Sequence, residues 1–422
     1  MTTKEKNKRL KILSVPAWYP TKFNPVNGIF IQEQIKASNL YNDNLIIYPN
    51  SLGPHPNSFY NISENIEDGV KVFNIRTNYY WFFTKIFSYK KNPKNLKEGN
   101  ENIIKRNKKI SIVFTYLNVI INNTIWFFLV LRILRNIFKN DFKPDIFHIH
   151  VFTVGVPIVI LSKLFKIPVV VTEHYTGFSR RNLNRIEMIL AKYTMNNAAA
   201  ILPVSTGLKN HIENYGIKNN FFVVPNVVDT EIFHPIYKNL KNEKIKMLLV
   251  ANITHQKGIY YLLQALNKLK KKRNDFTLDI VGDGCDRLEY EELTKKLGLD
   301  EFVKFHGLKT KKEVAIYMQN CDFFIQPSLY ETFGVVYIEA MACGKPVIAT
   351  NVTGPNEIIN ENNGILIPPK NINAIVHAVD QMLDHYDNYS PECISNYINK
   401  NFSYEIVGKK LDGIYKQIIN GD

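Results

Sequence analysis

Cysteine is scarce in this sequence and does not occur in pairs. The 422 residues include four cysteines, with no C-x-x-C motif and no cluster of histidine and cysteine at zinc-binding spacing. This pattern excludes a disulfide framework and a structural zinc site as the basis of the fold. It predicts reduced, mostly buried thiols in a cytoplasmic protein.

Long apolar segments are also rare. The N-terminal segment is basic, but its apolar run is four to six residues long and Pro16 interrupts it, which is too short for a secretory signal. Residues 110–131 carry no charge and are long enough to cross a bilayer. Polar residues recur along one helical face from Ser111 to Asn122, and central asparagines are costly in lipid. We therefore predict a long buried helix, with contact to a membrane surface as the alternative. The preceding stretch, residues 79–109, is aromatic and then rich in Lys and Asn, and is expected to be an insertion or a flexible loop.

The net charge of +15 is distributed unevenly. Residues 1–210 hold 29 Lys and Arg against 12 Asp and Glu, a net +17, whereas residues 211–422 carry a net −2. A one-sided basic surface predicts an acidic partner, such as an anionic membrane or a phosphorylated acceptor. A solvated, lysine-rich surface without a specific role is the alternative. No arginine-rich stripe interleaved with aromatic residues is present, so we expect no nucleic-acid partner.

Strand and helix patterns alternate along most of the chain. From residue 145 onward, short β-branched runs are followed by helical patterns with brief links, which predicts parallel sheets with helical crossovers. Residues 223–235 contain two prolines and break the rhythm, after which the alternation restarts. We therefore expect an α/β fold with two Rossmann-like, doubly wound domains, residues 1–222 and 223–403, facing a central cleft. A terminal helix at about residues 404–420 is expected to pack back on the first domain.

The strongest chemical signal lies in residues 328–350, SLYETFGVVYIEAMACGKPVIAT. A strand is predicted to end near Gln326–Ser328 and a helix to begin close to Gly334, whose missing side chain lets the backbone approach a ligand. Ligands of parallel sheets bind at the carboxyl ends of the strands, where a helix N-terminus offers free N–H groups to phosphate. Glu331 and Glu339 are eight residues apart, and carboxylates accept hydrogen bonds from vicinal hydroxyls. The pattern predicts a ligand with phosphate and sugar rings; the alternative is a capping glutamate and a surface glutamate.

This segment resembles the signature of glycosyltransferase family 4, a group of retaining enzymes with the GT-B fold, and the chain is similar to the bacterial surface-polysaccharide type. The family pattern has two glutamates eight apart around Phe-Gly, then Glu-Ala-Met-Ala, Gly and Pro-Val, all present in residues 331–347. The resemblance covers nearly the whole chain and is weakest in residues 50–140. Its other parts are NPVNGIFIQEQ (24–34), VVVTEHYTGF (169–178), VPNVVDTEIF (224–233), KFHGLK (304–309) and FSYEIVGKKLDGIY (402–415).

The resemblance implies a role for each matched residue. Glu339 would bind the ribose hydroxyls of the donor nucleotide, and Glu331 would hold hydroxyls of the transferred sugar. His174 would face the donor sugar near the reacting carbon, and Lys257 would neutralise the diphosphate leaving group. The implied catalytic residues are therefore His174, Lys257 and Glu331. The implied donor-binding residues are Gly28 from the opposite domain, Asn252, Lys257, Leu308 beside the base, Glu331, Thr332, Phe333, Gly334 and Val335 at the sugar and diphosphate, and Glu339.

The sequence departs from the family pattern just before Lys257. The family usually reads Gly-Arg-Leu there, and its arginine assists the diphosphate, whereas Ala251 and Asn252 occupy the Gly and Arg positions of this chain. Asparagine can donate a hydrogen bond but carries no charge, so bidentate charge-assisted pairing is lost. Either another base such as His255 compensates, or leaving-group stabilisation is weaker.

No metal ligands are recognisable in the sequence. A D-x-D motif, through which many glycosyltransferases hold Mg²⁺ or Mn²⁺, is absent, so we expect neither a metal nor a cofactor. His148 and His150 share a strand face without a third ligand, which favours a core or cleft-edge role. The G-x-G of residues 282–285 has Arg287 in place of a third glycine, and a tight turn explains it equally well.

We therefore predict a retaining, metal-independent glycosyltransferase. The first domain would bind a lipid-linked or saccharide acceptor and the second a nucleotide-sugar donor, with a UDP-sugar favoured and a GDP-sugar also compatible. The basic first half then indicates a cytoplasmic protein at the inner face of the plasma membrane, in surface-polysaccharide assembly. The alternatives are another GT-B chemistry, such as an epimerase or a phosphorylase, and a non-catalytic sugar-nucleotide-binding partner or scaffold.

Overall fold

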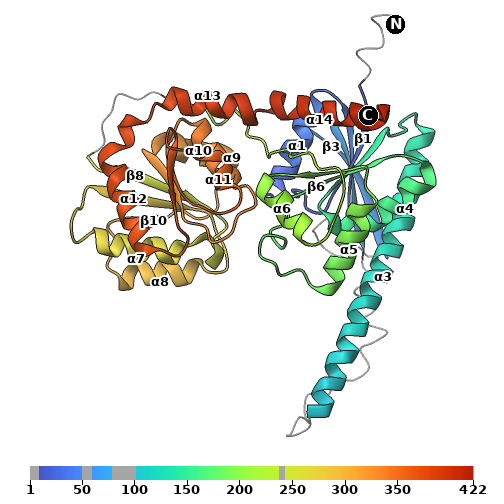
Figure 1. Ribbon diagram of the computed structural model, residues 1–422, viewed down its shortest axis with the longest axis horizontal. Coiled ribbons are helices and arrows are strands. Elements are labelled where there is room, and N and C mark those ends of the chain that lie inside the picture. Colours follow the sequence, from blue (N-terminus) through green and yellow to red (C-terminus); the bar gives the residue numbers. More distant parts are fainter. Residues whose placement is uncertain (1–8, 50–58, 78–100, 237–242, 422) are drawn as a thin grey trace, which may run out of the picture.

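The computed structural model describes residues 9–49, 59–77, 101–236 and 243–421, and the side chains of α3 from residue 117 onward. It contains two α/β domains that lie side by side, each built on a largely parallel sheet (Figure 1). The fold class predicted from the alternating pattern is therefore confirmed.

The N-terminal domain is built on a seven-stranded sheet of order β3-β4-β2-β1-β5-β6-β7. All neighbouring strands are parallel except β3, which forms an antiparallel hairpin with β4 at the edge. The strands are β1 (Lys11–Pro16), β2 (Asp43–Tyr48), β3 (Tyr60–Glu67), β4 (Val70–Thr77), β5 (Ile146–His150), β6 (Val169–Glu173) and β7 (Ala200–Pro203). The helices are α1 (Ile29–Asn39), α3 (Glu101–Lys139), the 3₁₀ turn η2 (Phe152–Val154), α4 (Gly155–Phe165), α5 (Arg185–Asn196) and α6 (Thr206–Asn214).

The C-terminal domain has a six-stranded, fully parallel sheet of order β10-β9-β8-β11-β12-β13. The strands are β8 (Ile245–Val250), β9 (Phe276–Val281), β10 (Val303–Phe305), β11 (Phe323–Gln326), β12 (Val347–Thr350) and β13 (Gly364–Ile367). The helices are η3 (His255–Lys257), α7 (Ile259–Leu269), α8 (Arg287–Lys296), α9 (Lys311–Asn320), α10 (Val335–Ala342), α11 (Pro355–Ile358), α12 (Ile372–His385), η4 (Tyr386–Asn388) and α13 (Pro391–Phe402).

The last helix returns to the first domain. Helix α13 is followed directly by α14 (Tyr404–Asn420), and together they run across both domains (Figure 1). Val407, Leu411 and Tyr415 of α14 are fully buried against apolar residues of β1, β5, β6 and β7. This packing sets the last helix against β1 and holds the domains next to each other.

The long helix α3 corrects two expectations. Residues 101–109, expected to be a loop, continue the helix, because extension of an existing helix adds a hydrogen bond for each residue fixed; residues 79–100 of that expected loop lie outside the described part of the chain. The helix is also less buried than predicted, since only 33% of its most apolar window lies inside the protein. Trp126, Val130 and Leu134 pack on the domain, whereas the earlier turns extend beyond it (Figure 1).

The expectation that the thiols are mostly buried is half correct. Cys321 and Cys343 are buried in the core, whereas Cys285 and Cys393 are exposed. All four are free, so the fold rests on packing and hydrogen bonds.

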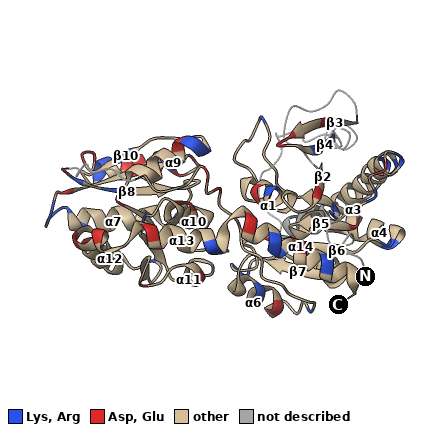
Figure 2. Ribbon diagram, turned by 90° about the horizontal axis from the view of Figure 1, so that it is seen from above, with Lys and Arg blue, Asp and Glu red and all other residues tan. Residues whose placement is uncertain are grey.

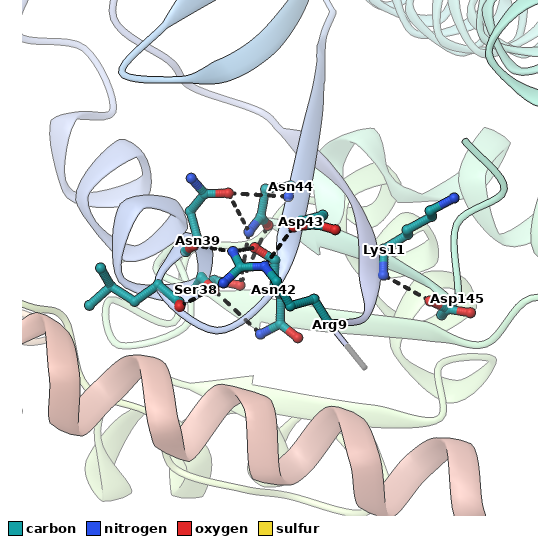
Figure 3. Close-up of polar contacts among 9 residues, drawn as sticks. Arg9, Lys11, Ser38, Asn39, Asn42, Asp43, Asn44 and Asp145 are labelled. Atoms are coloured by element: carbon teal, nitrogen blue, oxygen red, sulfur yellow. Dashed lines mark hydrogen bonds and ion pairs between the residues drawn. The ribbon is translucent and has the colours of Figure 1, made fainter. Parts of the chain in front are cut away.

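A polar cluster closes the amino-terminal end of the first sheet (Figure 3). Arg9 donates to Asp43 Oδ1 at 2.6 Å and to three backbone carbonyls at the turn between α1 and β2. The Lys11 N–H donates to Asp145 Oδ2 at 2.8 Å, which joins the starts of β1 and β5. These contacts fix the strands at one end and leave the opposite, carboxyl end for a binding site.

Candidate functional site

The N-terminus of α10 lies at the carboxyl end of β11, where the sequence predicted it. Gly334 precedes the helix with φ 86° and ψ 70°, and no side chain of the described residues caps its first turn. The Tyr337 N–H donates to the Gly334 carbonyl at 3.1 Å, which leaves the N–H groups of Val335 and Val336 available. The positive end of the helix dipole adds to their attraction for an anion. The arrangement favours a phosphate or a similar anion in front of Gly334.

An ion pair lies beside this helix terminus. Lys257 Nζ is 2.6 Å from Glu331 Oε1, and Glu331 is only 8% exposed. The same oxygen accepts from Ser328 Oγ at 3.0 Å and from Gln326 Nε2 at 3.3 Å. A buried carboxylate requires such partners, and together they fix the position of the Lys257 ammonium.

Tight packing of two loops places Lys257 and Glu331 together. Gly258, at the junction of η3 and α7, has φ 70°, and a Cβ there would lie 1.9 Å from the Pro327 carbonyl oxygen. The Leu329 N–H donates to the Gln256 carbonyl at 2.7 Å. The loops that follow β8 and β11 therefore form one unit, and this unit carries both members of the ion pair.

Glu339 lies on α10, beyond the free first turn, and is partly buried. Burial raises the pKa of its carboxyl to about 7, while nearby Lys311 lowers that pKa and Glu33 raises it. Lys311 forms ion pairs with Glu33 of the N-terminal domain and, at 3.2 Å, with Asp229. A carboxyl with a pKa near neutrality exchanges readily between its two forms, and pairing with hydroxyl donors favours the ionised one.

Three histidines line up at the carboxyl ends of β5 and β6 in the other domain. The His150 ring centroid is 4.1 Å from that of His148 and 6.1 Å from that of His174. His148 is hydrogen-bonded to Thr172 and to Tyr415, each at 2.7 Å, whereas the ring nitrogens of His150 are buried without a partner among the described residues. The buried ring of His174 has the Asn226 side chain as its polar neighbour. Burial lowers the pKa of His174 to about 3, so its imidazole is neutral at physiological pH and can exchange hydrogen bonds with sugar hydroxyls.

Glu173 holds the loops that position His174. Its carboxylate accepts from the N–H groups of His174 at 2.9 Å, Tyr175 at 2.7 Å and Phe152 at 3.2 Å. Burial raises its pKa to about 7 against the opposing effect of these three hydrogen bonds. Val151, which precedes Phe152 in the loop after β5, has φ 73°, a strained conformation for a β-branched residue. One buried carboxyl thus fixes both loops.

The domains meet through hydrogen bonds around the same loops. Ser205 Oγ donates to the Thr332 carbonyl at 2.7 Å, and Thr332 Oγ1 donates to the His174 carbonyl at 3.2 Å. Glu357 of α11 accepts from the first two N–H groups of α6, at 2.8 and 2.7 Å. Arg180 of the N-terminal domain donates to Gln256, which precedes Lys257. The structure therefore places His174 close to the α10 terminus.

Most of the residues named from the sequence come together here. Lys257, Glu331, Thr332, Gly334 and Val335 surround the α10 terminus, and the backbone carbonyl of His174 accepts from Thr332 across the domain boundary. Phe333 contributes its backbone only, because its side chain is buried against Phe402 with ring centroids 5.8 Å apart.

Four named residues lie at the margin. Asn252 is exposed just beyond β8, and Leu308 is 54% exposed after β10. Gly28 has φ 74°, and a Cβ there would lie 2.4 Å from the Trp18 backbone, so packing of its own loop already requires glycine. His255 lies at the start of η3, where its N–H donates to Asp286.

The residues that sequence reasoning missed are those of the domain boundary. Ser205, Glu357, Arg180 and Lys311 each contact a residue more than 70 positions away in the chain. Of these, Ser205 carried a local signal, as a helix N-cap whose Oγ accepts from the Leu208 N–H at 3.2 Å. Among the described residues, no group of three or more His, Cys, Asp or Glu lies close enough to hold a metal ion.

Comparisons with known proteins agree with this geometry. The model of Glycosyltransferase Family 4 matches residues 92–232, and the model of Glycosyl transferases group 1 matches residues 233–400. These two adjoining matches define the class of the protein, a two-domain α/β glycosyltransferase. Within that class, the chain belongs to the family-4-type glycosyltransferases, as the two adjoining matches show.

Two relatives come from Methanocaldococcus jannaschii, and both are described as uncharacterised glycosyltransferases. One is 33% identical over 180 residues, 42% of this chain and 46% of that protein. The other is 29% identical over 305 residues, 68% of this chain and 83% of that protein. The matched part of this chain thus spans about half the length of the first relative.

Solved structures resemble the whole chain. Sucrose-phosphate synthase from Thermosynechococcus elongatus has a TM-score of 0.71 at 18% identity, covering 98% of this chain and 100% of that one. HepE from Anabaena, solved with UDP and glucose, has a TM-score of 0.67 at 16% identity, covering 97% and 100%. At these identities the likeness shows the GT-B fold.

Proposed function

We propose that this glycosyltransferase moves a sugar from a nucleoside diphosphate sugar to an acceptor with retention of the anomeric configuration and without a metal. The observation that carries the proposal is the Lys257–Glu331 pair, 2.6 Å apart, beside the free N-terminus of α10. A cation and unpaired N–H groups suit a diphosphate, and a fixed carboxylate suits sugar hydroxyls. HepE, a structural neighbour, binds UDP and glucose, which supports a UDP-sugar as the donor.

Charge development explains how these residues would act. As the bond from the anomeric carbon to the diphosphate breaks, negative charge grows on the leaving oxygen, next to the Lys257 ammonium and the α10 N–H groups. Glu331 and neutral His174 hold the sugar while the carbon becomes positive. The acceptor hydroxyl would approach from the N-terminal domain, on the face from which the diphosphate leaves, and this approach keeps the configuration.

Donor selection gives the first test of this proposal. Binding and slow hydrolysis are measured over UDP-, GDP- and ADP-sugars without added metal, using wild type and Glu339→Ala. We expect selective binding of one donor, weakened at least about tenfold in Glu339→Ala because the ribose hydroxyls lose a charged acceptor. Glu301→Ala, an exposed glutamate of the same domain, is the matched control. Absence of binding to every donor by folded protein would contradict the proposal, and binding without transfer would favour the scaffold alternative.

We also propose that the N-terminal domain docks on an anionic membrane to reach a lipid-linked acceptor. In the described residues, one helical segment, Leu117–Lys139, is long and apolar enough to cross a membrane. Phe128 of α3 is 61% exposed and Leu164 of α4 is 60% exposed, on helices that pack against each other. Helices α3 and α4 also carry Lys and Arg residues (Figure 2). Exposed apolar residues flanked by cations are typical of helices that lie in an anionic interface.

Vesicle binding tests the docking surface. Wild type should bind vesicles containing phosphatidylglycerol far better than phosphatidylcholine vesicles, with an affinity that falls as salt rises. The variant Phe128→Glu/Leu164→Glu should bind about tenfold more weakly or worse, because it places carboxylates at the lipid surface. Ile316→Glu on α9 changes an equally exposed residue of the other domain and should have no effect. Equal vesicle binding by both variants would exclude this surface.

A further inference from the structure

The leaving-group site of the C-terminal domain is short of positive charge. Asn252 stands where the family resemblance implies an arginine, and it is exposed and uncharged. Lys257 is already paired with Glu331 at 2.6 Å. A diphosphate that departs from a sugar carries at least two negative charges, so one paired lysine and a helix terminus leave it incompletely balanced.

Arg180 brings a second cation to the same place from the other domain. Its guanidinium donates to Gln256 Oε1, and its Cζ lies 6.0 Å from the centre of the Tyr330 ring. Gln256 directly precedes Lys257, and Tyr330 directly precedes Glu331. Arg180 is thus held by the two immediate chain neighbours of the ion pair.

Within the described part of the chain, no carboxylate pairs with the guanidinium of Arg180. None of the ion pairs found among the described residues includes Arg180, and its Nε is buried without a hydrogen-bond partner in that part of the chain. Its hydrogen-bond acceptor, Gln256, is a neutral amide that an anion can replace. Arginine donates in a planar fork that fits phosphate oxygens, so this charge is available to an oxyanion.

The loop that carries Arg180 is well anchored. Phe178 is fully buried, and the Arg180 N–H donates to the Thr176 carbonyl at 3.0 Å. The Asn182 N–H donates to the Gly177 carbonyl at 3.3 Å. The backbone is therefore fixed by the N-terminal domain, and only the side chain has to leave Gln256 to reach a ligand.

We propose that Arg180 is the second cation of the leaving-group site and binds the diphosphate across the domain boundary. It would take the place of the arginine that the family resemblance implies at position 252, where this chain has asparagine. This inference rests on the proposed function.

The bond between the anomeric carbon and the diphosphate oxygen breaks, its electron pair stays on that oxygen, and the acceptor oxygen bonds to the carbon. The acceptor proton passes to the diphosphate, and Arg180 donates N–H groups to the phosphate oxygens without itself being deprotonated. Because Arg180 and Lys257 belong to different domains, full stabilisation requires the domains to be closed.

The experiment compares a nucleoside diphosphate with its monophosphate. The probes are UDP and UMP, or the GDP or ADP pair if the donor panel selects that base. Arg180→Ala should bind UDP about tenfold more weakly than wild type and UMP equally well, and its kcat should fall about a hundredfold. The UDP affinity and the kcat of Arg180→Lys should lie between those of wild type and those of Arg180→Ala. Arg185→Ala, an exposed arginine five residues away, is the control and should match wild type.

A rescue variant makes the test specific. Arg180→Ala/Asn252→Arg restores a cation on the C-terminal side, and we expect it to regain at least tenfold of the lost kcat. Equal loss of UDP and UMP binding, or a raised acceptor KM with unchanged kcat and UDP affinity, would overturn the proposal and assign Arg180 to packing or to the acceptor. A wild-type protein that binds no nucleoside diphosphate would instead refute the proposed function, so the two failures are distinguishable.

Discussion

Replacing Lys257 by methionine should lower kcat by about a thousandfold while changing the donor KM much less. Methionine keeps the length and the apolar stem of lysine but removes the charge that faces the leaving diphosphate. That charge matters most when the bond to the diphosphate is breaking, so its loss raises the barrier more than it weakens ground-state binding. Steady-state kinetics over a range of donor concentrations would separate the two effects.

Two further variants separate catalysis from structure. Lys257→Met leaves Glu331, which is 8% exposed, without its cation, and this alone destabilises the loop. In Lys257→Met/Glu331→Gln the unpaired charge is gone, so we expect thermal stability to recover and kcat to stay low. Lys304→Ala removes an exposed lysine of β10 and should leave kcat unchanged. A Lys257→Met variant that retains kcat within about threefold of wild type would remove Lys257 from the chemistry.

The part of the site that could be predicted from the sequence is the part encoded locally. Residues 328–350 form the loop after β11, helix α10 and strand β12 in one continuous stretch, and the structure places Glu331 and Gly334 just before the helix, as predicted. Glycine at 334 is required by its backbone conformation, with φ 86°, and such a requirement is visible in a single sequence. The same holds for the alternation of strands and helices, since each period reflects which face of an element is buried.

The domain boundary could not be predicted in this way. The hydrogen bond from Ser205 to the Thr332 carbonyl joins residues 127 apart, and Glu357 binds the first turn of a helix in the other domain. Such pairs depend on how two finished domains pack, and no periodicity in the chain records that. The position of Arg180 at the domain boundary could not be predicted for the same reason, because its partner Gln256 lies 76 residues further along the chain.

How deeply a single helix or strand is buried could also not be predicted from the sequence pattern. The uncharged run at residues 110–131 indicated a helix correctly, but composition does not tell whether the partner of an apolar face is the core, a membrane or water. In the structure, Trp126 and Val130 are buried whereas Phe128 is exposed. The edge strand β3 (Tyr60–Glu67) is not predicted, because it is mostly exposed and Glu64 interrupts the alternation of Tyr60, Ile62 and Ile66.

Replacing Gly258 by alanine should destabilise the C-terminal domain by about 3–5 kcal/mol and lower its Tm by roughly 10 °C. The backbone at Gly258 has φ 70°, which costs energy for any residue with a Cβ. The added Cβ would also lie 1.9 Å from the Pro327 carbonyl oxygen, a backbone atom that cannot turn away as a side chain would. Thermal unfolding followed by circular dichroism measures the effect. Gly413→Ala is the matched control, since Gly413 lies in α14 with no atom within 4 Å of its added Cβ, and it should be neutral or slightly stabilising.

The Gly258→Ala variant should lose activity even at temperatures where it stays folded. To relieve the clash, the loop after β8 must move away from the loop after β11, and these two loops carry Lys257 and Glu331. Glu339 lies further along α10, eight residues after Glu331. We therefore expect kcat to fall about a hundredfold at 20 °C below the variant's Tm, with nucleoside binding largely retained. A Tm within about 2 °C of wild type would show that the clash is absorbed without cost, and the packing of the two loops would then not be what fixes the ion pair.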